Sequence, residues 1–223
     1  MNYIYITASF YMMLVLTMLA GQKVYALPLM NTDDAGIVER GHCQIELDQR
    51  HRDDQSSEVN LGPACNVLNF ELGLPLAWDD GDSSYAIQVK KELFVSESLP
   101  VAVAGSVQWQ PRQNNEAENW EFNLPVTITA IDKFQFDLNV GMTREDHHNE
   151  MTWGVASTYD LHDKHQISLE FFKLEPSRAR TQAVYHYHVV PDNLSLYAAY
   201  GHPLQSDDQS WFGVGLSWVT PFR

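Results

Sequence analysis

The chain has 223 residues, of which 29 are Asp or Glu and 14 are Lys or Arg, and its formal net charge is −15. This acidic balance disfavours nucleic acid and anionic membrane surfaces as partners, because both carry negative charge. The length suits one domain, and no segment after residue 26 approaches the ~18 consecutive apolar residues of a membrane-spanning helix. The acidic side chains either solvate the loops or attract cations.

The chain begins with an apolar segment that is typical of a secretory signal. Residues Ile4 to Leu19 are almost all apolar, and Val24-Tyr25-Ala26 has the small-x-small pattern of a cleavage site. We therefore predict a signal peptide over residues 1–26, although no Lys or Arg precedes the apolar run. An N-terminal membrane anchor is the alternative. Residues 27–41 have no clear period and are predicted to form an irregular lead-in.

Short stretches of alternating apolar and polar residues fill the rest of the chain. In the clearest, residues 134–143, large apolar side chains take every second position. Neighbouring residues of a β-strand lie on opposite faces, so this stretch has one apolar and one polar face. Twelve such strands are predicted, with boundaries accurate to a few residues. They cover residues 42–50, 59–66, 69–78, 85–94, 99–110, 119–129, 134–143, 150–159, 165–174, 180–190, 194–202 and 210–220.

Twelve amphipathic strands behind a secretory signal indicate an all-β fold, a transmembrane antiparallel up-and-down barrel over residues 42–223. Its predicted links alternate between longer, acidic ones such as 51–58 and 144–149 and short ones such as 67–68. This pattern is expected when one end of a barrel faces the exterior of the bacterial cell and the other faces the periplasm. The alternative is a soluble periplasmic β-sandwich or β-barrel binding protein, whose apolar faces would form an internal core.

Aromatic residues near the strand ends are predicted to form girdles at the two membrane–water boundaries, where indole and phenol rings are favoured. They are Trp78, Tyr85, Trp109, Trp120, Trp153, Tyr159, Trp211 and Trp218. In a soluble protein the same residues would be core anchors.

Some residues depart from regular strands. Pro75 and Pro125 lie mid-strand and lack an N–H, although a closed barrel has no edge strand to accommodate them. We interpret both as bulges or local bends whose prolines face the lumen. Lys91 falls on the predicted apolar face, and Phe171-Phe172 breaks the alternation.

The chain has two cysteines, Cys43 and Cys65. The signal would send both to an oxidising compartment. If residues 42–50 and 58–66 form a hairpin centred on Asp54, the two thiols face each other, close enough for a cross-strand disulfide. Two buried free thiols are the alternative.

Several short segments carry a family resemblance. They are Leu27-Pro28-Leu29, Thr32–Gly36, Gly41–Leu47, Asn69–Pro75 and the aromatic-rich end, Trp211–Phe222. These segments resemble a bacterial outer-membrane barrel family, the meta-pathway phenol-degradation or putative transporter type. The resemblance implies uptake of aromatic compounds and a terminal aromatic that the barrel-assembly machinery recognises. Here Arg223 follows Phe222, so that signal is displaced by one residue.

No catalytic motif stands out. The chain has no nucleophile elbow, phosphate loop or zinc-type cysteine set. His186 and His188 would both point into the lumen, where they could bind a metal only with a third ligand, and polar lumen filling is the simpler interpretation. We therefore predict neither an enzyme nor a cofactor or metal site. An outer-membrane lipid hydrolase is the alternative, and it would need a Ser-His pair at the outer lipid boundary.

The polar strand faces predict the lining of the lumen. The candidates are Glu46, Asp48, Arg50, Glu71, Lys90, Glu92, Glu121, Asp137, Glu170, Arg180, His186 and His188. Acids outnumber Lys and Arg, so an open pore would favour cations. If the three basic residues pair with the acids instead, the same side chains would plug the barrel.

The predicted function is passive passage or binding of small molecules, aromatic or cationic, in the bacterial outer membrane. The expected partners are outer-membrane lipid, the assembly machinery during biogenesis and an unidentified permeant, without nucleic acid. A closed barrel with a structural or surface-interaction role is the alternative.

Overall fold

The computed structural model describes residues 29–96, 98–113, 117–146, 148–175, 178–205 and 209–222. The predicted signal peptide, residues 1–26, lies outside the described residues. No helix in the described part of the chain is long and apolar enough to span a membrane. Its strands are β1 (His42–Arg52), β2 (Ser57–Val67), β3 (Phe70–Gly73), β4 (Leu76–Asp79), β5 (Asp82–Tyr85), β6 (Ile87–Val95), β7 (Val101–Gln110), β8 (Asn119–Ile131), β9 (Phe134–Glu145), β10 (His148–His162), β11 (His165–Glu175), β12 (Arg178–Val190), β13 (Leu194–Pro203) and β14 (Trp211–Pro221).

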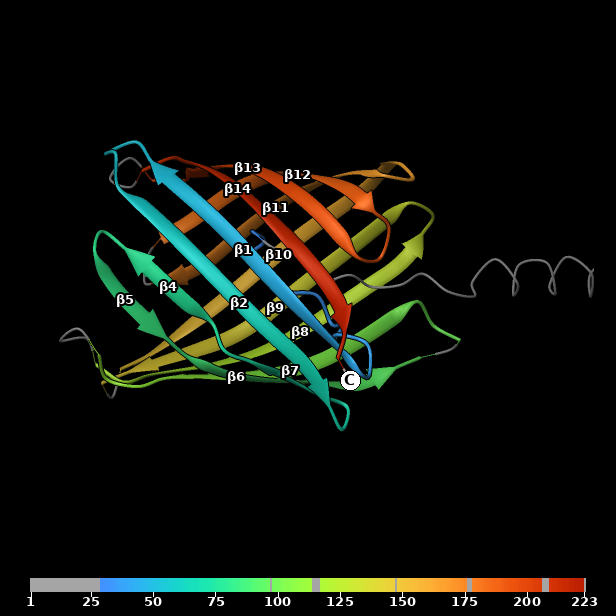
Figure 1. Ribbon diagram of the computed structural model, residues 1–223, viewed down its shortest axis with the longest axis horizontal. Helices are drawn as coiled ribbons and strands as arrows, with labels where there is room; N and C mark the ends of the chain where they lie inside the picture. Colours follow the sequence, from blue (N-terminus) through green and yellow to red (C-terminus); the bar gives the residue numbers. More distant parts are fainter. Residues whose placement is uncertain are drawn as a thin grey trace, which may run out of the picture.

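The strands form one closed antiparallel sheet. β1 pairs with β2 on one side and with β14 on the other, so the sheet has no free edge. β3 and β4 both pair with β2 and follow one strand path, and β5 and β6 form the next path. Counting each of these pairs once gives twelve strands, which run obliquely around a single barrel in Figure 1. The predicted twelve-stranded barrel is confirmed.

Both mid-strand prolines interrupt the ladder without shifting its register. At Pro75 the strand divides, β3 ending at Gly73 and β4 beginning at Leu76. The backbone N–H of Ala86 donates to the Pro75 carbonyl oxygen at 2.9 Å, so the wall stays hydrogen-bonded there. At Pro125 the β7–β8 ladder loses its pairs and resumes in the same register. Of the two predicted alternatives, the bulge is wrong, since a bulge would add a residue to one strand. Pro75 lines the cavity and Pro125 is fully buried, as expected for prolines that face the lumen.

The predicted alternation of long and short links is only partly right. The link expected over 144–149 contracts to residues 146–147, and β4 and β5 are separated only by residues 80–81. The strands continue pairing past the apolar stretch, because polar residues can extend a ladder that protrudes from the membrane. The longest links, residues 111–118 and 204–210, do lie at the end of the barrel opposite the β2–β3 turn.

The outer face of the barrel is apolar. Large apolar side chains with more than a third of their surface exposed lie on most strands, among them Leu72, Val89, Phe122, Leu138, Val155, Leu169, Leu196 and Val214. A continuous exposed apolar surface of this kind is unfavourable in water and suits contact with lipid. Of the predicted girdle residues, Trp78, Tyr85, Trp153 and Trp218 are exposed.

Lys91 and the Phe171-Phe172 pair, which break the predicted alternation, still have defined positions on the barrel wall. Lys91 is exposed, and its ammonium lies 4.1 Å from the ring centroid of Phe70, near the β2–β3 turn. The methylene chain of Lys91 can thus lie along the apolar outer surface while its ammonium stays near the end of the barrel. Phe171 is exposed and Phe172 is buried, so this pair places one ring on each face.

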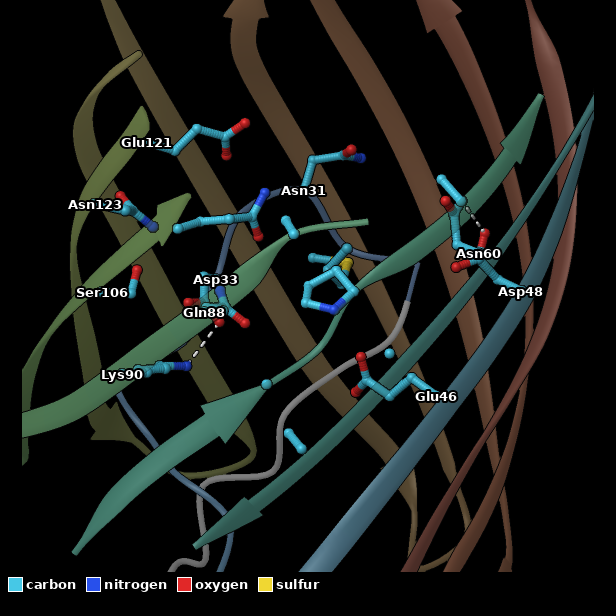
Figure 2. Close-up of a pocket in the computed structure, with 18 of the residues that line it drawn as sticks. Asn31, Asp33, Glu46, Asp48, Asn60, Gln88, Lys90, Ser106, Glu121 and Asn123 are labelled. Atoms are coloured by element: carbon cyan, nitrogen blue, oxygen red, sulfur yellow. Dashed lines mark hydrogen bonds and ion pairs between the residues drawn. The ribbon is translucent and has the colours of Figure 1, made fainter. Parts of the chain in front are cut away.

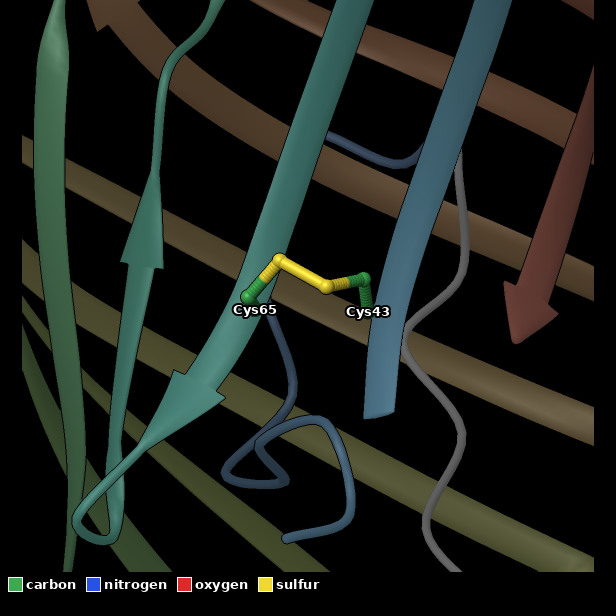
Figure 3. Close-up of a disulfide and its surroundings, with 2 residues drawn as sticks. All are labelled: Cys43 and Cys65. Carbon is green, nitrogen blue, oxygen red and sulfur yellow. A yellow bond between two sulfur atoms is a disulfide. The ribbon is translucent and has the colours of Figure 1, made fainter. Parts of the chain in front are cut away.

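Cys43 and Cys65 lie directly opposite each other on β1 and β2, with their Cα atoms 4.0 Å apart. A disulfide joins them, as Figure 3 shows. The bond fixes the register of the hairpin that begins the barrel, next to the β1–β14 closure.

Replacing both cysteines by serine is expected to lower the free energy of unfolding by about 3 kcal/mol. The bond closes a loop with a sequence separation of 22, and its loss releases the unfolded chain from that constraint. Urea titration of the detergent-folded barrel measures the change. Reduction of the disulfide in the unaltered protein should lower the free energy of unfolding by the same amount. If neither the double substitution nor the reduction shifts the urea midpoint of unfolding, the disulfide does not make the expected contribution to stability.

Candidate functional site

The lead-in runs through the barrel interior before β1 begins. Its first ten described residues, Leu29–Val38, are called the lumen segment below. They contact inward-facing side chains of β11 and β12 at one end and of β2 and β3 at the other. These strands lie on different sides of the barrel, so the lumen segment crosses the interior.

Glu170 holds the start of the lumen segment. Its carboxylate accepts the backbone N–H groups of Asn31 at 3.0 Å and Thr32 at 2.8 Å. Gln182 donates to the same carboxylate at 2.9 Å and to the Leu29 carbonyl oxygen at 2.6 Å. A fully buried carboxylate needs such donors to offset its lost hydration. Glu170 therefore serves as an anchor for the segment.

Asn139 and Thr127 hold the middle of the lumen segment. The backbone N–H of Asp33 donates to Asn139 Oδ1 at 2.8 Å, and Asn139 Nδ2 donates to the Asp33 carbonyl oxygen at 2.6 Å. Ala35 N–H donates to Thr127 Oγ1 at 2.8 Å. The threonine hydroxyl in turn donates to Asp137 Oδ1 at 2.6 Å, which fixes its orientation. Both wall side chains are buried, so these bonds are shielded from bulk water.

The end of the lumen segment is fixed at β2 and β3. Val38 N–H donates to Glu71 Oε2 at 2.7 Å, and Asn66 Nδ2 donates to the Val38 carbonyl oxygen at 2.6 Å. On β6, Lys90 Nζ lies 2.8 Å from Asp33 Oδ1 and 3.9 Å from Asp34 Oδ1. The buried lysine is thus neutralised by the lumen segment itself.

Apolar side chains fill one side of the lumen. Leu29 is 3% exposed and packs with the inward-facing Val184, Tyr197 and Ala199 of β12 and β13. Trp211, predicted for the outer girdle, is instead 8% exposed, and its indole N–H donates to Gln182 Oε1 at 3.0 Å. The prediction of an outer-girdle position for Trp211 is therefore wrong, because its side chain is used to pack the lumen although it lies at a strand end.

The other side of the lumen holds a polar cavity of about 510 Å³ above the lumen segment. Figure 2 shows polar side chains from β1, β2, β6, β7 and β8 turned toward it. Its lining includes seven carboxylates, Asp33, Asp34, Glu46, Asp48, Glu58, Glu71 and Glu121. Two basic side chains, Arg50 and Lys90, also line it. Arg50 Nε lies 3.3 Å from Asp48 Oδ1, so both cations already have carboxylate partners.

Eleven of the twelve predicted lumen residues fall into three groups. Those that line the polar cavity are Glu46, Asp48, Arg50, Glu71, Lys90 and Glu121. Those that are buried in the remaining interior are Asp137, Glu170 and His186, while Arg180 lies half-buried with its guanidinium 5.9 Å from the Trp211 ring. His188 lines a separate cavity of about 260 Å³ near the β10–β11 and β12–β13 turns.

Glu92 lies on the same face of β6 as Lys90, because both keep one register against β7, Lys90 opposite Ser106 and Glu92 opposite Ala104. It is exposed and lies beside Val38 and Glu39 in a pocket at the barrel end, outside the main cavity. The β6–β7 register shifts only after Glu92.

The two predicted inward histidines each lie beside a serine hydroxyl. His186 is fully buried, and its Nε2 lies 2.9 Å from Ser168 Oγ. His188 Nδ1 lies 2.8 Å from Ser195 Oγ. Within the residues that the structure describes, no three His, Cys, Asp or Glu side chains are grouped to hold a metal ion.

The closed barrel, its apolar outer face and its polar interior define a bacterial outer-membrane β-barrel. Residues 14–219 match the family described as "Uncharacterised conserved protein UCP029691", and the chain belongs to that family. Nothing in this match carries the phenol-degradation label, so that finer resemblance stays a prediction. No curated protein matches the chain.

Solved outer-membrane barrels share the fold. The KdgM porin superposes with a TM-score of 0.65 at 14% identity, over 78% of this chain and 98% of that one. The NanC porin gives a TM-score of 0.62 at 11% identity, over 78% and 98% of the two chains. The COG4313 outer membrane channel from Pseudomonas putida F1 gives 0.59 at 8% identity, over 86% and 100%. At these identities the likeness concerns the fold.

Proposed function

We propose that this protein is a passive outer-membrane channel that admits small cations in preference to anions. The observation that supports this proposal is the composition of the cavity, seven carboxylates against two basic side chains that are both already paired. Carboxylates around a water-filled passage attract cations and repel anions. No catalytic role is proposed.

The KdgM porin has been solved in complex with disordered oligogalacturonate, a chain of acidic sugars. The cavity here is poorly suited to such an anion, because its basic side chains face carboxylates of the protein itself. Aromatic solutes, which the sequence resemblance implies, would meet Tyr85, Phe122 and Trp153 among the residues that line the cavity. The excess of carboxylates leads us to favour cationic permeants, aromatic ones included.

A closed barrel without transport is the second candidate. It is favoured by the lumen segment, whose backbone is hydrogen-bonded to Glu170, Asn139, Thr127 and Glu71 across the interior. In that case membrane-inserted protein would give no current. The apolar outer face argues against the soluble alternative. We propose outer-membrane lipid and the barrel-assembly machinery as partners.

Reversal potentials in a KCl gradient test the selectivity. We expect potassium to be more permeant than chloride in planar bilayers, and Glu121→Gln to reduce that preference, because it removes a cavity carboxylate without changing the side-chain shape. Asp132→Asn is the matched control, since Asp132 is exposed between β8 and β9 and does not line the cavity. A chloride preference in the unaltered protein would reject the proposed selectivity.

A further inference from the structure

Three cavity carboxylates, Glu46, Glu71 and Glu121, form no salt bridge within the described residues, and Glu71 Oε2 already accepts the Val38 N–H at 2.7 Å. Glu46 on β1 accepts a hydrogen bond from Gln44 Nε2, and Glu121 on β8 accepts one from Asn119 Nδ2 at 3.1 Å. Neither forms a salt bridge within the described residues. Asp48 and Glu58 differ from these three, since Asp48 faces Arg50 and Glu58 lies 2.6 Å from Arg52.

A third acceptor comes from the lumen segment. Asp34 is 3% exposed and lines the same cavity. Its Oδ1 accepts the Gly36 N–H at 2.6 Å, but its Oδ2 has no hydrogen-bond partner among the described residues. A buried carboxylate oxygen without a donor is costly, and a ligand N–H entering the cavity would supply the missing bond.

The acceptors are spread around the cavity. Glu46 and Glu121 come from strands on nearly opposite sides of the barrel and lie on opposite sides of the view in Figure 2. A single metal ion cannot contact both, in agreement with the absence of a three-ligand group in the described part of the chain. A chain of methylenes that carries several ammonium groups can reach separated acceptors, and each ammonium brings N–H donors.

The remaining lining suits such a chain. Asn31, Asn60, Gln88 and Asn123 are labelled in Figure 2, and all line the cavity. Their amide oxygens can accept further N–H bonds without adding charge. A volume of about 510 Å³ also lies within the range of small-molecule sites.

We propose that the cavity binds linear polyamines, small organic cations with two or more protonated nitrogens, through Glu46, Glu121 and Asp34. This inference rests on the proposed function, because it identifies the class of cation that the channel retains. The polyamine occupies the space beside the lumen segment, with its nitrogens at these three carboxylates and its methylenes between them.

Spermidine is the probe. In single-channel recordings from planar bilayers, spermidine is added to the solution that faces the cavity. It is expected to interrupt the potassium current at concentrations where Mg²⁺ of equal ionic strength has little effect. Glu46→Gln and Glu121→Gln should each weaken the apparent affinity about fivefold, since each removes one partly screened ion pair. Asp132→Asn should leave it unchanged.

The outcomes separate this inference from the proposed function. A cation-selective current that spermidine does not interrupt, or that Mg²⁺ interrupts equally, would overturn the polyamine site and leave the channel intact. If the barrel carries no current, calorimetry on the folded protein in detergent decides. Heat of spermidine binding that is lost in the Glu46→Gln, Glu121→Gln double variant supports the site, and the absence of heat in the unaltered protein rejects it.

Discussion

Removal of the lumen segment, residues 29–38, is expected to raise the single-channel conductance several-fold. A twelve-stranded barrel is wider than the ~8-stranded barrels whose interior side chains can fill. In this protein the lumen segment occupies the interior space that the side chains leave open, and it is hydrogen-bonded to Glu170, Asn139 and Glu71. Without it those wall side chains would face water, which can replace the lost hydrogen bonds. Planar-bilayer recordings of the shortened and unaltered proteins measure the effect.

The shortened protein must remain a folded barrel for this comparison. Heat-modifiable gel mobility provides that control, because an inserted barrel resists unfolding by detergent at room temperature. Glu170→Gln is a milder variant, which weakens the anchor of the Asn31 and Thr32 N–H groups and is expected to give more frequent transitions to larger conductance. Equal conductance in all three proteins would mean that the segment does not lie in the path of the ions.

Replacement of Leu138 by arginine is expected to destabilise the folded protein by about 2–4 kcal/mol, the cost of a lipid-facing cation near the bilayer midplane. Leu138 is 39% exposed and lies in the middle of β9, between Val126 of β8 and Val155 of β10. Urea unfolding in lipid vesicles measures the difference.

The matched control is Gln108→Arg, which introduces the same cation into the polar cavity. Its cost should be much smaller, because the cavity is lined by carboxylates that can pair with the added cation. If both substitutions cost the same, the assignment of the outer and inner faces is wrong.

The strands were predictable because their physics is local. The alternation in residues such as 134–143 reflects which face of a strand contacts lipid and which contacts water. The sequence therefore located all twelve strand paths. The hairpin centred on Asp54 placed Cys43 opposite Cys65, and the structure pairs them in that register. Strand ends were less predictable, because polar residues beyond the membrane carry no alternation and still pair.

The interior was less predictable than the wall. The lumen segment is held largely by its backbone N–H and carbonyl groups, which depend little on residue type, so its side-chain pattern did not predict its position. Its wall partners Asn139, Thr127 and Gln182 are uncharged, and the selection of charged lumen residues passed over them. Trp211 shows the reverse case, in which a girdle-type residue is used to pack the interior.

The most direct test of this account is the single-channel conductance of the purified, full-length protein, recorded after its heat-modifiable mobility has shown it to be folded. We predict discrete current steps, because the cavity above the lumen segment is polar and its carboxylates attract cations. Folded, membrane-inserted protein that gives no current steps would contradict the channel and leave a closed barrel plugged by its own N-terminal segment.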